Sequence, residues 1–168
     1  MFRKISKVGV KKEVLKLKRK IRRKNPNAVQ LENELKDTKH FGGIFSQEQL
    51  KNIIILKYPV ILLVIVNQHW ITLYIDKSSF EVYDSLMDIC EYEDVLRFIK
   101  NNLFFKTLKI FPQIQSNDNF DCAFFAKFFI KAKSNQIPFK TLLNLFSSNF
   151  KLNSKLVRAG FNATVFSD

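Results

Sequence analysis

The sequence has little of several residue types, and each scarcity excludes a class of protein. Its 168 residues include only four glycines and four prolines, which excludes a collagen-like or low-complexity chain. Two cysteines, Cys90 and Cys122, do not make a disulfide framework, so we expect a reducing, intracellular setting. The longest uninterrupted apolar run, Val60–Val66, is far shorter than the ~18 residues that a membrane span requires. Charges also interrupt any signal-peptide-like run at the N-terminus.

Acidic residues are scarce at the N-terminus, where positive charge is concentrated. Residues 1–24 hold twelve Lys or Arg and one acid, a net charge of +11, whereas the remaining residues carry only +2. Apolar residues recur at helical spacing over 8–24, which predicts a basic amphipathic arm over 1–26 and a separate domain over 27–168. Contact with a polyanion such as nucleic acid fits this arm, and nuclear targeting or an anionic membrane surface would also fit. The cations expected to bind nucleic acid are Lys11, Lys12, Lys16, Lys18, Arg19, Lys20, Arg22, Arg23 and Lys24.

The domain reads as helices, then a cluster of strands, then helices again, which predicts an α+β fold with an antiparallel sheet. The run Val60–Val66 is rich in β-branched residues and apolar on both faces, as a central strand should be. Two glycines predict a loop over 40–45, and Ser46 is a plausible helix N-cap. From Ser147 onward the sequence is mixed in character, and no element is assigned. We expect helices over 28–36, 47–55, 93–103, 121–132 and 139–146, strands over 60–66, 69–76 and 80–84, and at best an edge strand over 108–115.

Two of the expected strands form a hairpin whose register brings a histidine toward an aspartate. With Lys77 and Ser78 as a two-residue turn, apolar residues mostly face apolar ones, which favours this register over a one-residue slip. His69 then becomes a diagonal neighbour of Asp84, with Cβ atoms roughly 7 Å apart, close enough for a hydrogen bond between the side chains. Asp84 would hold one ring nitrogen of His69 and leave the other free as a base. The alternative is a surface histidine beside a strand-terminal aspartate, and His40 is a weaker candidate for the base.

Cys122 opens a predicted helix that is apolar almost all round and therefore buried. Free backbone N–H groups and the positive end of the helix dipole favour a thiolate there, although free cysteines also often pack as small core residues. Gln115 lies seven residues upstream, where its amide can donate to a developing oxyanion together with the backbone N–H of Cys122. A histidine, an acid, a glutamine and a cysteine in this order are the parts of a Cys-His acyl-transfer site. Cys90, next to Ile89, is expected to be buried.

Three short motifs lie in the expected hairpin and before the buried helix: His69-Trp70, Tyr83-Asp84-Ser85-Leu86, and Gln115 followed by Asp121-Cys122. Together they resemble the clan of cysteine proteases that contains the adenovirus maturation proteases and the Ulp/SENP SUMO proteases. The resemblance covers about residues 40 to 135. The interval between glutamine and cysteine and the segment 41–46 are closer to the adenoviral, virus-type branch, and Ala123 stands where the family usually has glycine.

The resemblance implies a papain-like α+β core with a mostly antiparallel central sheet flanked by helices, and a nucleophile at the N-terminus of a buried helix. In that core Cys122 would be the nucleophile, His69 the base and Asp84 the group that orients it. Gln115 would help to form the oxyanion hole, and Trp70 would flank the substrate cleft.

The same resemblance implies an endopeptidase that cleaves viral structural precursors after small residues, often glycine, in the host nucleus or the virion. Nucleic acid bound by the basic arm would act as an activator. No metal or other cofactor is expected, because the two histidines and two cysteines lack a close ligand spacing, and we expect a monomer. Two alternatives stay open, namely a deconjugating protease for SUMO or another ubiquitin-like protein, and a basic DNA-binding protein with an inert protease-like fold.

Overall fold

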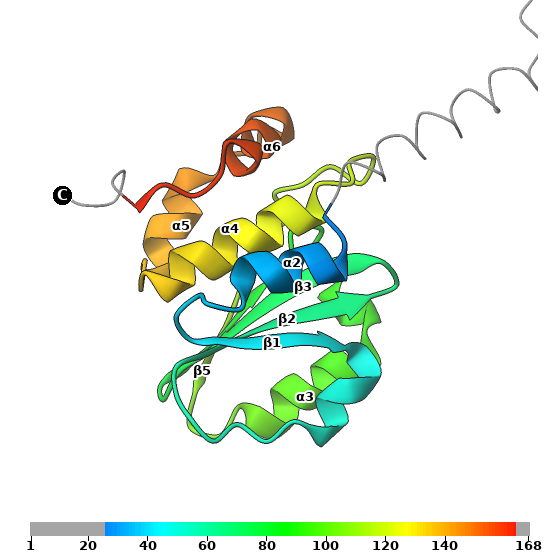
Figure 1. The fold of residues 1–168 in the computed structure, drawn as a ribbon, viewed down its shortest axis with the longest axis vertical. Helices are drawn as coiled ribbons and strands as arrows, with labels where there is room; N and C mark the ends of the chain where they lie inside the picture. Colours follow the sequence, from blue (N-terminus) through cyan, green and yellow to red (C-terminus); the bar gives the residue numbers. More distant parts are fainter. Residues whose placement is uncertain (1–25, 164–168) are drawn as a thin grey trace, which may run out of the picture.

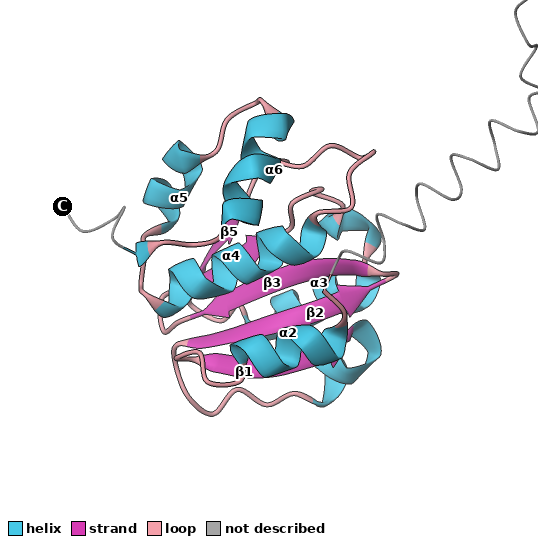
Figure 2. Ribbon diagram, turned by 45° about the horizontal axis from the view of Figure 1, so that its top comes forward, coloured by secondary structure: helices cyan, strands magenta, loops and turns pink. Residues whose placement is uncertain are grey.

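A five-stranded sheet forms the centre of the computed structural model, which describes residues 26–163 (Figures 1 and 2). The basic arm helix expected over 8–24, with the nine cations named above for nucleic acid, lies outside the described residues. The elements in chain order are α2 (Ala28–Leu35), β1 (Phe41–Ser46), the 3₁₀ helix η1 (Gln47–Asn52), β2 (Val60–Val66), β3 (His69–Ile75), β4 (Ser79–Tyr83), the 3₁₀ helix η2 (Ile89–Glu91), α3 (Glu93–Asn102), β5 (Thr107–Ile110), α4 (Cys122–Ser134), α5 (Phe139–Leu145) and α6 (Phe150–Ala159).

The sheet is mixed rather than mostly antiparallel, which corrects the sequence prediction. Its strands lie in the order β1-β2-β3-β4-β5, and the outer pairs β1–β2 and β4–β5 are parallel while the inner pairs are antiparallel. The parallel pairs arise because η1 and α3 provide the crossover connections that parallel neighbours need. The fold class is α+β, with a mixed five-stranded sheet and helices on both faces.

Strand β1 lies where the glycines predicted a loop. A Cβ on Gly42 would lie 2.8 Å from Cγ2 of Val60, so only glycine allows β1 to approach β2 this closely. The register shifts between Phe41 and Gly43, and Gly43 has a φ of 123°. The glycines therefore serve a tight, irregular edge strand rather than a loop.

The two hairpins follow the sequence prediction. Asn67 and Gln68 form a two-residue turn with φ of 48° and 71°, the left-handed geometry that suits a tight hairpin, and Val66 pairs with His69. Hydrophobic matching predicted the register of β3 with β4, and the structure confirms it. The pairs are Thr72↔Tyr83, Leu73↔Val82, Tyr74↔Glu81 and Ile75↔Phe80.

Helices cover both faces of the sheet (Figures 1 and 2). On one face α3, η1 and η2 bury the apolar side chains of β2, β3 and β4, and on the other α4 lies along β3 with α2, α5 and α6 around it. The face of β4 that carries Glu81 and Tyr83 is also buried. Glu81 is only 3% exposed there and accepts from Tyr83 Oη at 2.6 Å, while the ammonium groups of Lys133 and Lys109 lie at 2.9 Å and 3.3 Å.

Three local expectations need correction or completion. Only a 3₁₀ helix forms over Gln47–Asn52, in place of the α-helix expected over 47–55. The unassigned tail forms α6, which begins where Asn149 Oδ1 accepts from the backbone N–H of Leu152 at 3.2 Å. Cys90 is exposed, contrary to expectation, because it lies in η2, where Ile89 rather than Cys90 faces the core.

Candidate active site

The structure brings His69 and Asp84 into direct contact at one end of the sheet. His69 begins β3 and Asp84 directly follows β4, so the hairpin register puts both side chains on the face that α3 covers. His69 Nε2 lies 2.6 Å from Asp84 Oδ1, and both residues are buried. Because a carboxylate oxygen only accepts, Nε2 carries the proton in this bond. Asp84 Oδ1 also accepts from the backbone N–H of Leu86 at 3.1 Å, which fixes the carboxylate.

Two atoms of this pair are buried without a partner. Nδ1 of His69 and Oδ2 of Asp84 make no hydrogen bond to any described residue. Buried polar atoms are nearly always satisfied, so such exceptions call for an explanation, and catalysis is one of the recognised ones. With Nε2 protonated, the unpartnered Nδ1 is the nitrogen able to accept a proton.

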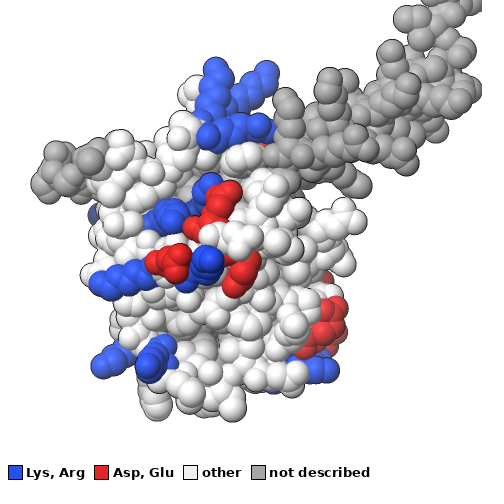
Figure 3. All heavy atoms as spheres, in the orientation of Figure 1, with Lys and Arg blue, Asp and Glu red and all other residues white. Residues whose placement is uncertain are grey.

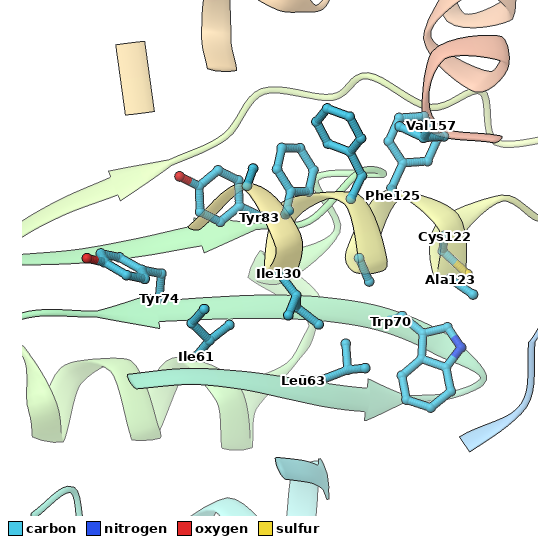
Figure 4. Close-up of a cluster of buried hydrophobic side chains, with 14 of the residues drawn as sticks. Ile61, Leu63, Trp70, Tyr74, Tyr83, Cys122, Ala123, Phe125, Ile130 and Val157 are labelled. Carbon is cyan, nitrogen blue, oxygen red and sulfur yellow. The ribbon is translucent and has the colours of Figure 1, made fainter. Parts of the chain in front are cut away.

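Cys122 lies next to this histidine. It is the first residue of α4, it is 9% exposed, and it lines the same cavity as His69, with a volume of about 460 Å³. Figure 4 shows Cys122 at the start of α4, at the same end of the core as Trp70 of β3. Trp70 and Gln115 also line this cavity. Four of the five side chains that the sequence predicted for the site therefore line one cavity. The fifth, Asp84, does not line it but contacts His69.

The environment of His69 favours its protonated form. Burial lowers its pKa, but the hydrogen bond to Asp84, the neighbouring Cys122 sulfur and the charges of both groups outweigh burial and raise the pKa to about 9. Nδ1 makes no hydrogen bond, so we interpret the influence of Cys122 as the electrostatic effect of a nearby sulfur rather than as a formed bond. Contacts between a nucleophile and its base are often long before substrate binds.

Tyr92 closes the other side of the histidine. Its ring centroid lies 6.5 Å from that of His69, and its side chain is 8% exposed. Burial, with the nearby charge of Asp84, raises the pKa of Tyr92 to about 12, so its ring stays neutral. The ring of Tyr92 therefore forms part of the buried surroundings of His69. The sequence carried no signal for this role.

Gln115 is fully buried, and both ends of its amide are held. Its Oε1 accepts from Ser85 Oγ at 2.6 Å, and its Nε2 donates to the backbone carbonyl of Asn119 at 2.8 Å. The backbone carbonyl of Ser85 also accepts from the N–H groups of Ile114 and Gln115, each at 3.0 Å. Since the amide oxygen is committed to Ser85, the NH₂ end is fixed, and one of its two protons remains available at the cavity. Sequence reasoning missed Ser85 as the residue that sets this orientation.

Side chains of helix α6 bind the chain on either side of the candidate site, next to Gln115 and at the start of α4. Asn153 Nδ2 donates to the carbonyl of Ile114 at 2.9 Å. Arg158 forms a two-pronged ion pair with Asp121, the buried carboxylate directly before Cys122. This pairing neutralises a negative charge that would otherwise oppose a thiolate next to it. Sequence reasoning missed these contacts, because the mixed character of the chain from Ser147 onward predicts no helix there.

The remaining candidates lie outside the site or fit it without strain. His40, the weaker candidate for the base, precedes β1 and does not line the cavity. Ala123 is fully buried within α4 and is not among the residues with positive φ, so the helix does not need glycine at this position.

Within residues 26–163, no group of three or more His, Cys, Asp or Glu is placed to hold a metal ion. In the same range, no helix is both long and apolar enough to cross a membrane.

Comparison with known proteins gives a similarity to a solved structure. The sequence matches no family model and no curated protein. Among solved structures, the chain is similar to a SUMO protease Ulp1 with the catalytic cysteine oxidised to a sulfenic acid, with a TM-score of 0.32 and 14% sequence identity. The chain is distantly similar in fold to a SUMO protease. The match covers 60% of this chain and 52% of that one, so the chain spans about half of the SUMO protease. This similarity does not confirm the adenoviral branch.

Proposed function

We propose that this protein is a cysteine peptidase that uses Cys122 as nucleophile, His69 as base and Asp84 as the residue that orients the base. The observation that carries the proposal is the 2.6 Å bond between His69 Nε2 and Asp84, which leaves the unpartnered Nδ1 in the neighbourhood of the Cys122 sulfur. The three side chains come from the start of β3, the end of β4 and the start of α4. Together they supply a base, a group that orients it and a nucleophile.

The proposed reaction has two stages. His69 Nδ1 takes the thiol proton, and the Cys122 sulfur attacks the carbonyl carbon of the scissile peptide bond. The oxyanion that forms accepts from the free amide proton of Gln115 and from the backbone N–H of Cys122. The C–N bond then breaks as His69 gives its proton to the leaving amine, which leaves a thioester on the enzyme. Water attacks the thioester, His69 takes the water proton and returns it to the sulfur, and the carboxylic acid product leaves.

The bond cleaved is proposed to follow a small residue, often glycine. This preference comes from the family resemblance, and the buried indole of Trp70 at the cavity is consistent with it, since a bulky ring leaves less room for a large substrate side chain. Structural precursors of a virus are the proposed natural substrates. A ubiquitin-like protein with a C-terminal Gly-Gly is the alternative substrate, and the same site would cleave it by the same steps.

The direct test is cleavage of peptides that contain Gly-Gly, with the parent chain and the Cys122→Ala variant. The expected result is cleavage by the parent and a loss of at least about 10³-fold in the variant, because no other group replaces the sulfur. Cys90→Ser is the matched control, since it removes an exposed thiol elsewhere and should leave the rate unchanged. Equal cleavage by Cys122→Ala and the parent would refute the peptidase. A ubiquitin-like probe with a reactive C-terminus then separates deconjugation, in which Cys122 is labelled, from precursor processing, in which it is not.

The basic arm is proposed to bind nucleic acid and to bring the peptidase to it. The support is its net charge of +11 in 24 residues, far above what solubility requires. Phosphate contacts release counterions, so the affinity for duplex DNA should fall steeply as salt rises, by about 0.9 log units per contacted phosphate for each tenfold increase in salt. Affinity that does not change between low and high salt argues against this role and leaves the arm as a solvated segment. If the protein binds DNA but no thiol-reactive probe modifies it, the result would instead favour the alternative of a DNA-binding protein with an inert protease-like fold.

A further inference from the structure

A second hollow lies beside the cavity of Cys122, and its lining combines two lysines and several polar side chains with the ring of Phe150. It has a volume of about 730 Å³ and lies between the segment 116–119 and α6. Ser116 and Asn119 line it from the segment, and Lys151, Ser154 and Lys155 line it from α6. None of the described residues that line it is acidic. Ammonium and hydroxyl groups can all donate hydrogen bonds, so the hollow is suited to a ligand rich in acceptor oxygens.

The wall between the two hollows is one short segment. Gln115 and Asn117 line the cavity of Cys122, Ser116 lines the second hollow, and Asn119 lines both. The carbonyl of Asn119 accepts from Gln115 Nε2 at 2.8 Å, and its Nδ2 donates to Ser154 Oγ at 2.6 Å. Hydrogen bonds to Gln115 and to α6 therefore hold the segment 116–119 from both sides. A peptide that extends from the cavity of Cys122 across this segment reaches the second hollow.

The charge of the C-terminal helices points the same way. From Cys122 to Ala163 the chain has seven Lys or Arg residues and no acid. Figure 3 shows a group of Lys and Arg side chains over α6. Some cations of this region have carboxylate partners, as in the pairs Lys127–Glu34, Lys133–Glu81 and Arg158–Asp121. Lys151 and Lys155, in contrast, form no ion pair with any residue that the structure describes. Cations that have no carboxylate partner and surround a hollow attract an anionic ligand.

We infer that this hollow is a substrate subsite that binds acidic side chains of the protein to be cleaved, on one side of the scissile bond. The inference rests on the proposed peptidase function and specifies its substrate class. The substrate's Asp or Glu carboxylates accept charge-assisted hydrogen bonds from Lys151 and Lys155, with Ser116 and Ser154 as neutral donors. A nucleic-acid phosphate would satisfy the same cations. The shared wall with the thiol cavity favours a peptide, because a substrate chain bound in that cavity can continue across residues 115–119 into the second hollow.

The first experiment measures kcat/KM for pairs of Gly-Gly peptides that carry either Glu or Gln at one position, moved along both sides of the scissile bond. At low salt we expect Glu to be preferred about three- to tenfold at positions on one side only, as two solvent-exposed ion pairs allow. The double variant Lys151→Gln/Lys155→Gln should bring the Glu/Gln ratio close to one. The matched control is Lys100→Gln/Lys140→Gln, which removes two exposed lysines elsewhere and should keep the ratio.

A second experiment measures binding without catalysis, using the full chain with Cys122→Ala and fluorescent Glu and Gln peptides. Tighter binding of the Glu peptide that the lysine variant abolishes supports the subsite. If such binding occurs but the parent chain cleaves nothing, the subsite stands and the peptidase function falls. Cleavage of Gly-Gly peptides with no lysine-dependent preference for Glu overturns the subsite and leaves the peptidase function intact. Binding of an oligonucleotide that depends on these two lysines, with no preference for the Glu peptide, also overturns it and identifies a nucleic-acid surface.

Discussion

Replacement of Asp84 by asparagine tests the role of the carboxylate, because it keeps the shape of the side chain and removes its charge. The 2.6 Å bond from His69 is a hydrogen bond to a charged group, and such a bond contributes about 1.5–3 kcal/mol, equivalent to about 10- to 150-fold in rate. A second effect adds to this loss. The asparagine amide can donate to Nε2, which moves the ring proton to Nδ1, where it prevents the ring from accepting the thiol proton, and in triads of this kind that error lowers kcat about 10⁴-fold. We therefore expect kcat/KM to fall by about 10² to 10⁴.

The assay is peptide cleavage measured from pH 5.5 to 9.5, with Asp37→Asn as the matched control. Asp37 is exposed and remote from the cavity, so this variant should keep the parent rate. Thermal unfolding of both variants checks that the fold is retained. An Asp84→Asn variant that is folded and within threefold of the parent rate would show that the carboxylate does not orient the base.

Three further predictions concern Ser85, His69 and Lys133. Ser85→Ala frees the Gln115 amide and should lower kcat about tenfold with KM nearly unchanged, whereas Ser85→Thr, which keeps the hydroxyl, should recover most of the loss; a change in KM alone contradicts this role. The raised pKa of His69 means that the folded state holds this proton more tightly than the unfolded chain. Urea unfolding should therefore show full stability below about pH 6.5 and a loss of up to about 3 kcal/mol as pH rises through 9, and a His69→Gln variant that keeps this slope contradicts the assignment. Lys133→Met removes the buried ammonium group from Glu81, which keeps only Tyr83 and the more distant Lys109 as partners, and should lower the free energy of unfolding by about 1–3 kcal/mol, whereas the exposed control Lys140→Met should change it by less than about 0.5 kcal/mol in the same urea titration.

The sequence predicted the hairpin that carries the site because two signals agreed there. Alternating apolar residues in the predicted strands 69–76 and 80–84 indicated the register, and the short polar breaks indicated the turns. Once the register is known, His69 and Asp84 must lie on one face, and the bond between them follows from strand geometry. The buried helix after Asp121 was equally readable, because it is apolar on nearly every side.

Other features were hidden because they depend on contacts between distant segments. The glycines of β1 look like loop residues until the close approach of Val60 shows why glycine is needed. The burial of Glu81 depends on its ion pair with Lys133, and no residue near Glu81 along the chain predicts that pair. The hydrogen bond of Ser85 to Gln115 joins residues 30 positions apart, and α6 was not predicted because apolar and polar residues are mixed along it. The positions of the site residues were thus readable from the sequence, whereas the contacts that hold them in place were not.

The central claim, that His69 activates the sulfur of Cys122, is tested most directly by the relative reactivity of the two cysteines. Cys90 is exposed, whereas Cys122 is 9% exposed, so accessibility alone predicts that Cys90 is alkylated faster. The measurement is the rate of iodoacetamide modification of each thiol at pH 6.5, followed by mass spectrometry of the two peptides, in the parent chain and in His69→Gln. Activation by His69 predicts that Cys122 reacts faster than Cys90 and that the variant loses this advantage. Faster modification of Cys90, with a Cys122 rate that is the same in both chains, would contradict the account.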